Sequence, residues 1–349
     1  MKKTLILLAL LLLVGVNSAT AQERKFNLYG VGFYNLENLF DTCHDEGKND
    51  YEYLPDGKNR WNGLKYSHKL KNMARVLSEL GTDKLPGIGC AVIGVSEVEN
   101  ARALTDLCNQ EPLKARNFQF VHVEGPDKRG VDCALLYNPK FFKVDHVKLV
   151  PYVYVLPADA DRATRGFLTV SGQMAGEHVV FIVNHLPSRF AGSFYREEGG
   201  RQIRLVKDSL MKEDPNVKLF VMGDMNDDPQ DKSMAEALGA KRKMNKVEEG
   251  GLWNPFWDTL ASGRGTLQYD GRWNLFDQII LSRSLLDVKG KKDYQTLTYW
   301  NHQIFMRDYL FQKEGKYKGN PLRTHAGGSW LDGYSDHLPT VVYVIKEVK

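Results

Sequence analysis

The chain has 349 residues, of which 42% are hydrophobic and 26% charged, and its formal net charge at pH 7 is +4. Cys43, Cys90, Cys108 and Cys133 are too few and too scattered for a disulfide framework or a Cys-x-x-Cys zinc site. An oxidising compartment would permit a disulfide, but the spacing selects no pair. There is no Pro/Ser-rich linker, internal repeat or low-complexity tract, so a single domain is expected despite the length.

The N-terminus has the three parts of a secretory signal peptide. Lys2 and Lys3 form its basic start, an apolar run covers 5–16, and an Ala-x-Ala cleavage site ends at Ala21. The apolar run is too short to span a bilayer, which argues against an uncleaved anchor. Cleavage near Ala21 removes both lysines, lowers the net charge to +2 and leaves a catalytic domain at 22–349 without a transmembrane segment. We expect this domain to be extracytoplasmic, either periplasmic or secreted, with no general attraction to polyanions.

Apolar runs typical of β-strands dominate the rest of the chain. They cover 28–34, 91–95, 118–123, 133–137, 142–150, 166–170, 178–184, 217–222, 276–281 and 338–345. Helical patterns cover 67–81, 100–107, 196–211 and 231–238. Ser67 and Asn100 are the expected N-caps of the first two helices, and Gly81 is the expected stop of the first. The segments 42–66 and 289–334 are expected to be long functional loops. Many strands with a few amphipathic helices favour two packed sheets flanked by helices, an α/β fold.

Seven segments place polar residues in or beside these runs. They are FYNLENLFD (33–41), VIGVSEVEN (92–100), KRGVDCALLYN (128–138), FIVNHLPSR (181–189), LFVMGDMNDDP (219–229), RWNLFDQIILS (272–282) and GYSDHLP (333–339). Because side chains alternate along an extended chain, Asp224 and Asn226 should point the same way from a strand end. Convergent Asp, Asn and His side chains suit a metal-assisted attack on phosphorus.

GDMN and SDHLP resemble the GDxN and SDHxP signatures of the endonuclease/exonuclease/phosphatase superfamily, and the other five segments fit it in order. This superfamily includes pancreatic-type deoxyribonucleases, abasic-site endonucleases, neutral sphingomyelinases and inositol-polyphosphate phosphatases. The resemblance runs from about Phe26 to the C-terminus. It implies a four-layer α/β/β/α sandwich with two mainly antiparallel sheets, in which the motif-bearing strand ends meet at one edge.

A metal site is expected around Glu97. A carboxylate that emerges from a buried strand is costly unless it is paired or metal-bound, although a solvated loop position, or a functional role for Glu99 instead, are the alternatives. The resemblance matches Glu97 to the family's metal ligand and Asn35 to its partner, and Asp336 is a further candidate. These oxygen donors suit Mg²⁺ or Mn²⁺, with Ca²⁺ as another option, rather than zinc.

Two of the nine histidines stand out through the resemblance. It implies that His337 meets the scissile phosphate, as acid/base or as a positive donor, and that Asp277 holds its tautomer and raises its pKa. His185 resembles a second phosphate-facing histidine, with Asp132 as its expected orienting partner. A histidine chosen blindly is more often a surface or core residue.

The GDMN segment supplies the remaining catalytic candidates. Asp224 would orient or deprotonate the attacking water, while Asn226 donates to a phosphate oxygen as charge builds up. The general base stays open between Asp224 and His337.

Four more residues are candidates for substrate binding. Arg189 and Arg129 could clamp phosphate, although a solvated charge is the alternative for either. Trp273 and Asn274 precede Asp277 and are expected to line the substrate cleft, unless the aromatic ring belongs to the core.

The expected function is divalent-metal-dependent hydrolysis of phosphate esters, with a secreted endonuclease-type phosphodiesterase as the first choice. Alternatives are a phosphatase, or a phospholipid, sphingomyelin or sugar-phosphate phosphodiesterase, because these share one core site. A non-catalytic binding module is disfavoured because Glu97, Asp224, Asn226 and His337 are all present. The implied partner is a phosphate ester, nucleic acid being one candidate, and no protein partner is implied.

Overall fold

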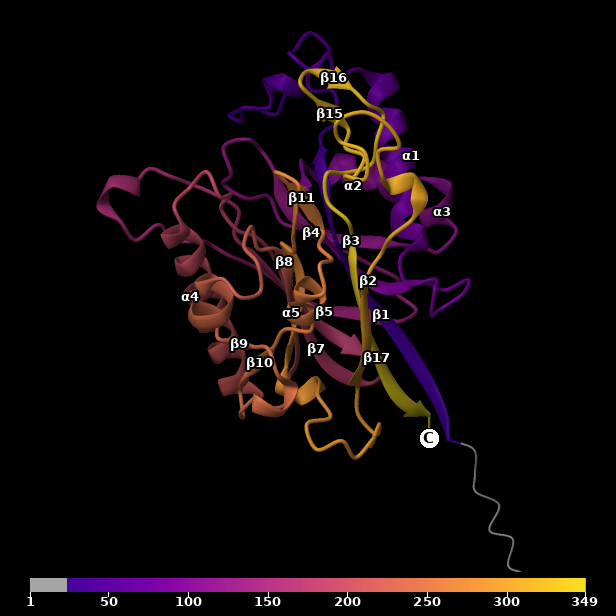
Figure 1. The fold of residues 1–349 in the computed structure, drawn as a ribbon, viewed down its shortest axis with the longest axis vertical. Coiled ribbons are helices and arrows are strands. Elements are labelled where there is room, and N and C mark those ends of the chain that lie inside the picture. The colour runs from indigo at the N-terminus through magenta and orange to yellow at the C-terminus, as the bar shows by residue number, and fades with distance from the viewer. Residues whose placement is uncertain (1–23, 349) are drawn as a thin grey trace, which may run out of the picture.

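The computed structural model describes residues 24–348 (Figure 1). The expected signal peptide lies outside these residues. Within the described part of the chain, no helix is long and apolar enough to cross a membrane. The first and last described strands lie side by side, so the two ends of the domain meet at one corner.

The first sheet has six strands in the order β14-β17-β1-β2-β4-β3. Their bounds are β1 Lys25–Leu39, β2 Cys90–Val98, β3 Gln119–His122, β4 Asp132–Tyr137, β14 Thr298–Ile304 and β17 Thr340–Val348. Only β1 and β2 pair in parallel, and the other neighbours are antiparallel.

The second sheet has seven strands in the order β5-β6-β7-β8-β13-β10-β9. Their bounds are β5 Phe142–Val150, β6 Phe167–Met174, β7 Glu177–His185, β8 Lys218–Asp224, β9 Ala240–Lys241, β10 Leu252–Trp253 and β13 Asp277–Ser282. The pairs β7·β8 and β9·β10 are parallel and the others antiparallel, so both sheets are mainly antiparallel. Two short hairpins complete the strands: β11 Leu267–Tyr269 with β12 Arg272–Asn274, and β15 His325–Ala326 with β16 Ser329–Trp330.

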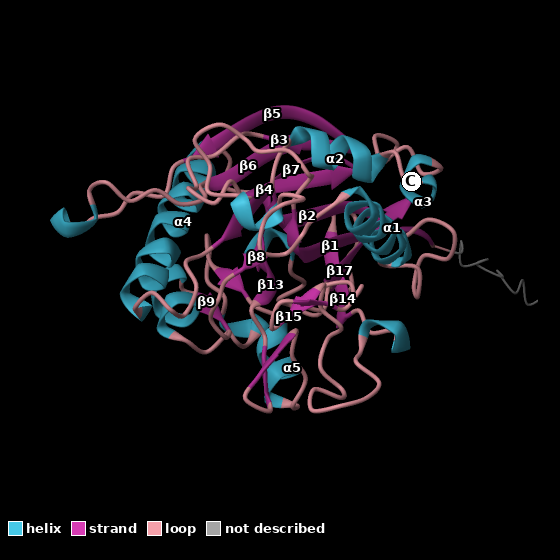
Figure 2. Cartoon of the chain, turned by 90° about the horizontal axis from the view of Figure 1, so that it is seen from above, coloured by secondary structure: helices cyan, strands magenta, loops and turns pink. Residues whose placement is uncertain are grey.

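Helices cover the outer faces of both sheets, as Figure 2 shows from above. Their bounds are α1 Gly63–Glu79, α2 Ala101–Cys108, α3 Glu111–Lys114, α4 Ser193–Glu213 and α5 Phe256–Ala261, with a π-helical turn at Ser233–Leu238. Short 3-10 turns lie at Tyr51–Tyr53, Pro157–Asp159, Met244–Lys246, Arg283–Leu285 and Asp308–Leu310.

Three buried apolar layers separate the two sheets and their helices. Strand β8 contributes side chains to two of these layers. Phe220 and Met222 pack between the sheets, whereas Leu219 and Val221 pack in the layer next to α4. Alternate side chains of a strand face opposite ways, and both faces of this strand are covered, so its sequence is a continuous apolar run. Each fully buried large side chain stabilises the fold by about 1.5–3 kcal/mol. The expected four-layer sandwich is confirmed.

The first helix begins earlier than predicted. Asn62, not Ser67, is its N-cap, because the Asn62 side chain accepts a hydrogen bond from the Lys65 amide. Gly81 follows the helix with a left-handed φ of 79°, in line with its predicted role. Asn100 caps α2 as predicted, accepting from the Ala103 amide at 2.9 Å.

The two segments expected to be loops are partly regular. The segment 289–334 contains β14, which pairs along β17 at the edge of the first sheet. In the segment 42–66, Trp61 is completely buried and its indole nitrogen donates to the Phe40 carbonyl at 3.0 Å. The prediction that this segment lies outside the core was therefore wrong for Trp61.

Candidate active site

Three neighbouring strands of the second sheet bring three motif residues side by side. His185 ends β7, Asp224 ends β8 and Asp277 begins β13, and the register pairs Asp224 with both of the others. Gly223 allows the close approach, because a Cβ on it would lie 2.2 Å from the Asn184 carbonyl oxygen. The sheet edge thus supplies the convergence that the sequence predicts.

His337 reaches the same point from the turn before β17. Its Nδ1 lies 2.7 Å from Asp277 Oδ2, the partner expected from the sequence, and its Nε2 lies 3.8 Å from Asp224 Oδ2. Burial disfavours the imidazolium, but the negative charges of Asp277 and Asp224 outweigh that effect and raise the pKa of His337 well above its usual value.

Asp224 lies at the centre of the cluster. Its Oδ2 accepts from Asn35 Nδ2 at 3.0 Å, and its Oδ1 accepts from the Asn226 amide at 2.9 Å. Burial raises the pKa of the Asp224 carboxyl to about 7, although the neighbouring His337 acts in the opposite direction. Hydrogen bonds thus hold both oxygens of the Asp224 carboxylate, and Oδ2 also faces the imidazoles of His185 and His337.

His185 lies between the acidic residues. Its Nε2 is 3.5 Å from Asp224 Oδ2 and 3.9 Å from Glu97 Oε1, and its buried Nδ1 has no hydrogen-bond partner among the described residues. Burial, together with the positive charges of Arg165 and Arg129, lowers its pKa well below the usual value. The expected pairing with Asp132 was wrong, because Asp132 Oδ2 lies 3.1 Å from His122 Nε2.

Glu97 is aimed at the cluster by an irregularity in β2. The register between β2 and β4 shifts between Ser96 and Val98, and Glu97 has a φ of 60°. Such bulges re-aim a side chain at the end of a ladder. Its Oε2 accepts from the Asn38 amide at 2.9 Å.

Left-handed backbone is concentrated here. Glu37, Asn38 and Asn226 also have positive φ values, of 46°, 57° and 50°. Non-glycine residues in this conformation cost of order 1–3 kcal/mol each and tend to cluster at functional sites.

A network that the sequence did not predict holds Asp336. Arg323 donates from Nη2 to Asp336 Oδ2 and from Nε to Glu37 Oε1, both at 2.9 Å. The buried Lys69 ammonium donates to Thr324 Oγ1 at 2.7 Å, and Glu37 accepts from the Thr324 amide. Burial raises the pKa of Glu37 to about 7 and lowers that of Lys69 to about 8.

The sequence does hold partial signals for this network. Lys69 stands four residues before Met73, on the apolar face of α1, and Glu37 stands two residues after Asn35 in the first motif. Spacing alone could not join either of them to Arg323, which lies 286 positions from Glu37.

The donor set fits a hard divalent cation. Around the histidines lie the carboxylates of Glu97, Asp224 and Asp336, and Glu97 forms no ion pair with a Lys or Arg of the described chain. Asp224, Asp277 and His337 also have ligand atoms within 4.8 Å of one another. Buried carboxylates repel one another unless positive charge offsets them, and oxygen donors favour Mg²⁺, Mn²⁺ or Ca²⁺.

The remaining predicted residues lie around this centre. Asn226 donates from Nδ2 to the Leu186 carbonyl at 2.9 Å, which leaves one amide hydrogen free for another acceptor. Trp273 is half-buried and packs against the apolar layer of the first sheet. Arg129 is exposed and forms no ion pair within the described residues.

The Arg189 side chain already forms several hydrogen bonds within the protein. Its guanidinium donates to Asp228 and Asp231, at 3.3 and 2.9 Å, and to Asn274 Oδ1 at 3.2 Å. These contacts brace the turn after β8, and a role of Arg189 or Asn274 in binding substrate stays a prediction.

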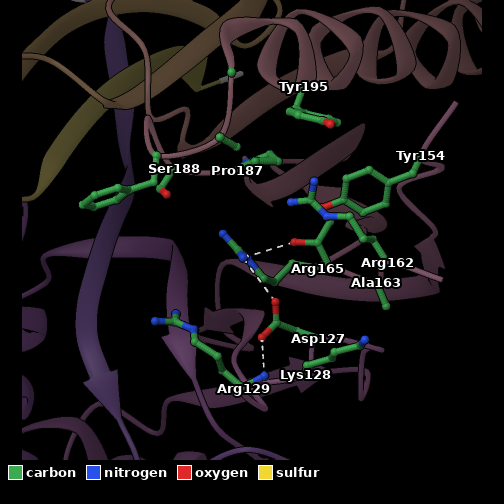
Figure 3. A pocket seen from close by; sticks show the side chains of 14 residues that line it. Asp127, Lys128, Arg129, Tyr154, Arg162, Ala163, Arg165, Pro187, Ser188 and Tyr195 are labelled. Atoms are coloured by element: carbon green, nitrogen blue, oxygen red, sulfur yellow. Dashed lines mark hydrogen bonds and ion pairs between the residues drawn. The ribbon is translucent and has the colours of Figure 1, made fainter. Parts of the chain in front are cut away.

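Two cavities are lined by residues that neighbour the Asp224 cluster in the chain. One, of about 720 Å³, is lined by Pro187 and Ser188, which follow His185, and is seen close by in Figure 3. The other, of about 770 Å³, is lined by Asp336 and by the exposed Tyr269. His185 and His337 both lie within 4 Å of Asp224, and each is one or two residues in the chain from a residue that lines one of the cavities.

Comparison with known proteins identifies the family of this chain. The model of the Endonuclease/Exonuclease/phosphatase family matches residues 30–346. No curated protein matches the chain by sequence.

Solved structures share the fold. A mannosyl-6-phosphatase from Bacteroides thetaiotaomicron is 15% identical, with a TM-score of 0.55 over 90% of this chain and 99% of that chain. D. rerio TDP2 complexed with a single-strand DNA product is 15% identical, with a TM-score of 0.52 over 91% and 98%. The human Nocturnin catalytic domain with bound sulfate is 14% identical, with a TM-score of 0.52 over 93% and 97%.

Identities this low show a common fold alone, whereas the family match spans both sheets and every residue of the Asp224 cluster. The chain belongs to the Endonuclease/Exonuclease/phosphatase family, whose members hydrolyse phosphate esters.

Proposed function

We propose that this protein is a divalent-metal-dependent phosphodiesterase of the endonuclease type, acting on a short stretch of substrate outside the cytoplasm. The observation that carries the proposal is the convergence of Asp224, Asp277 and His337 at one sheet edge, with one cavity lined by Pro187 and another lined by Asp336. A phosphodiester has a substituent on both sides of its phosphorus, so it can occupy both cavities. A phosphomonoester has only one.

Asp224, His337 and Asn226 have separate roles in the proposed hydrolysis. Asp224, held by Asn35 and the Asn226 amide, orients the attacking water and accepts its proton. His337 uses Nδ1 to contact Asp277, which leaves Nε2 to donate to a phosphate oxygen. The free amide hydrogen of Asn226 adds a second donor as negative charge builds up.

Glu97 and Asn35, with Asp336, are the residues that would hold the cation. A bound Mg²⁺ or Mn²⁺ neutralises charge on the phosphoryl oxygens. Glu97 faces the cluster through the bulge in β2, and Arg323 holds Asp336 beside His337.

A turnover assay on paired substrates tests the reaction. The mature protein receives a bis-aryl phosphodiester or the matching aryl phosphomonoester, with Mg²⁺, Mn²⁺ or EDTA, and then plasmid DNA, RNA, sphingomyelin and phosphoinositides. We expect metal-dependent cleavage of the diester and of a nucleic acid. Exclusive turnover of the monoester, or of lipid substrates, would replace the nuclease with one of the family's other activities. No turnover of any phosphate ester would favour a binding module.

The location rests on the sequence of the N-terminus. Lys2, Lys3 and the apolar run before Ala21 support export and cleavage. N-terminal sequencing of protein from cell fractions should find a chain that starts at Gln22 outside the cytoplasm. A cytoplasmic chain with an intact N-terminus would contradict this proposal.

A further inference from the structure

The cavity beside His185 is unusually rich in positive charge. Lys128, Arg129, Arg162 and Arg165 line it, against a single lining carboxylate, Asp127. We call this cavity the basic pocket. In Figure 3, Arg129, Arg162 and Arg165 lie on one side, and Pro187 and Ser188 lie across from them.

Two of these cations are uncompensated. Arg165 pairs with Asp127 at 3.2 Å, and Arg162 pairs with Asp159 at 3.0 Å. Lys128 and Arg129 form no ion pair or side-chain hydrogen bond with any described residue. An anionic group that enters the basic pocket therefore meets two positive charges without having to displace a carboxylate.

The pocket wall is braced from the inside. Buried Asp127 accepts from the Arg129 amide at 2.9 Å and from Arg165 Nη1 at 3.2 Å. Arg165 also donates from Nη2 to the Leu186 carbonyl at 3.2 Å, and its buried Nε has no partner. These bonds tie the loop that carries Lys128 and Arg129 to the residue after His185, so the pocket keeps a constant position relative to the catalytic cluster.

Aromatic side chains form the outer part of the pocket. The Arg162 guanidinium lies 4.8 Å from the ring centre of Tyr154 and 4.9 Å from that of Tyr195. Phe190 lines the mouth and is fully exposed. Cations with exposed rings are the combination that holds a phosphorylated substrate with a planar group.

The geometry points to a second phosphate-binding site: the basic pocket holds a further phosphate group of the substrate, next to the phosphate that is cleaved. This inference rests on the proposed phosphodiesterase function and narrows its substrate to molecules with at least two phosphates. The charges of the basic pocket also reach the catalytic cluster, because Arg165 and Arg129 contribute to the lowered pKa of His185.

A second phosphate could come from a nucleotide chain or from a small sugar bisphosphate, and paired substrates distinguish them. The first pair is thymidine 5′-(p-nitrophenyl phosphate) with and without a 3′-phosphate. The second is a p-nitrophenyl hexose phosphodiester with and without a further phosphate. Both members of a pair release the same nitrophenol, so the intrinsic chemistry is matched.

We expect the wild-type protein to cleave the two-phosphate member of one pair with a kcat/KM at least about tenfold higher, mainly through a lower KM. The double variant Lys128→Gln/Arg129→Gln should lose most of that ratio. The matched control Lys212→Gln removes an exposed charge from the end of α4 and should keep it. Circular dichroism would check that the variants are folded.

A binding measurement separates failure of the pocket from failure of the reaction. Calorimetric titration with thymidine 3′,5′-bisphosphate and with thymidine 5′-phosphate needs no turnover. Tighter binding of the bisphosphate, lost in the double variant, supports the pocket even if the reaction is misassigned. Equal affinities and equal kcat/KM values within both pairs would overturn the inference and leave the phosphodiesterase in place. No turnover of either member of either pair would instead overturn the proposed function.

Discussion

At the scale of single residues, the negative charge around Asp224 determines how the site works. Four carboxylates lie near two buried histidines: Glu97, Asp224, Asp277 and Asp336. Glu97 accepts a main-chain hydrogen bond from Asn38 and forms no ion pair with a Lys or Arg of the described residues. Its carboxylate is thus available to a cation rather than committed to an ion pair.

Glu97→Gln should lower the rate by several orders of magnitude, because removing one charged ligand from a site with few protein ligands weakens metal binding. Excess Mn²⁺ should restore part of the rate. Steady-state kinetics across a metal titration measures both effects, with the exposed Glu248→Gln as a control that stays at the wild-type rate. A Glu97→Gln variant that is fully active in EDTA would contradict the metal assignment.

The His337–Asp277 pair makes a second prediction. His337→Ala and Asp277→Asn should each reduce kcat strongly, because both act through one imidazole. The double variant should reduce kcat little more than His337→Ala alone does, because the effects of residues that act as a unit are not additive. A double-variant cycle of kcat values checks this, and fully additive losses would show that the two residues act separately.

The sequence predicted the His337–Asp277 pair but not the contacts around it. The family resemblance predicted that His337 pairs with Asp277, whereas alternation along an extended chain predicted only that Asp224 and Asn226 point the same way. The bracing of Asp336 by Arg323 and Glu37 was not predictable, because it joins a late loop to the first strand. The expected Asp132–His185 pair was wrong because Asp132 begins β4 in the first sheet, beside β3 with His122, whereas His185 ends β7 in the second sheet.

At the scale of elements, helix α1 offers a direct test of its corrected start. Asn62→Ala should lower the free energy of unfolding by about 1 kcal/mol, because it removes the acceptor for the Lys65 amide. Ser67→Ala lies inside the helix and should change it by less than about 0.5 kcal/mol. Urea unfolding measures the free energy of unfolding of both variants. A larger loss for Ser67→Ala would show that Ser67 is the N-cap, as the sequence predicts.

Strand β14 shows what pattern analysis misses. It is an edge strand with mixed burial, so its sequence lacks a clean alternation of apolar and polar residues. It nevertheless holds the half-buried His302, which contacts Thr259 Oγ1 at 2.9 Å and the Tyr299 hydroxyl at 2.7 Å.

His302 should make stability depend on pH. Burial, aided by the charge of Arg264, lowers the pKa of His302 from 6.5 to about 4, so the unfolded chain takes up a proton first as the pH falls. The stabilisation is therefore complete above about pH 6.5 and is lost as the pH falls towards 4. It amounts to on the order of 2–3 kcal/mol.

Urea unfolding at pH 7.5 and 4.5 measures this contribution. His302→Gln should reduce the loss of stability between the two pH values, whereas His146→Gln, at an exposed position on β5, should leave the loss unchanged. Equal losses in wild type and His302→Gln would contradict the assignment.

At the scale of the whole molecule, charge limits how much substrate can be bound. The mature chain has a formal charge of only +2, and the two cations without an ion pair among the described lining residues of the basic pocket are Lys128 and Arg129. A protein that follows a long duplex must neutralise many phosphates, each adding about −0.9 to the logarithmic salt slope of affinity.

We therefore expect a shallow salt dependence. The logarithm of kcat/KM against that of the salt concentration, at constant Mg²⁺, should have the slope of one or two phosphate contacts. A single-phosphate diester serves as the control and should have a slope no steeper than that of one contact. A slope equivalent to six or more contacts would indicate an extended nucleic-acid footprint instead.

The pairing of β1 with β17 has a consequence for when activity can appear. β1 lies between β2 and β17, and His337 immediately precedes β17. Because synthesis runs from the N-terminus, a partly made chain lacks both the outer neighbour of its first strand and the histidine of its catalytic pair. Hydrolytic activity can only follow completion of the first sheet. The order of synthesis thus makes the pairing of His337 with Asp277 one of the last contacts that the chain can form.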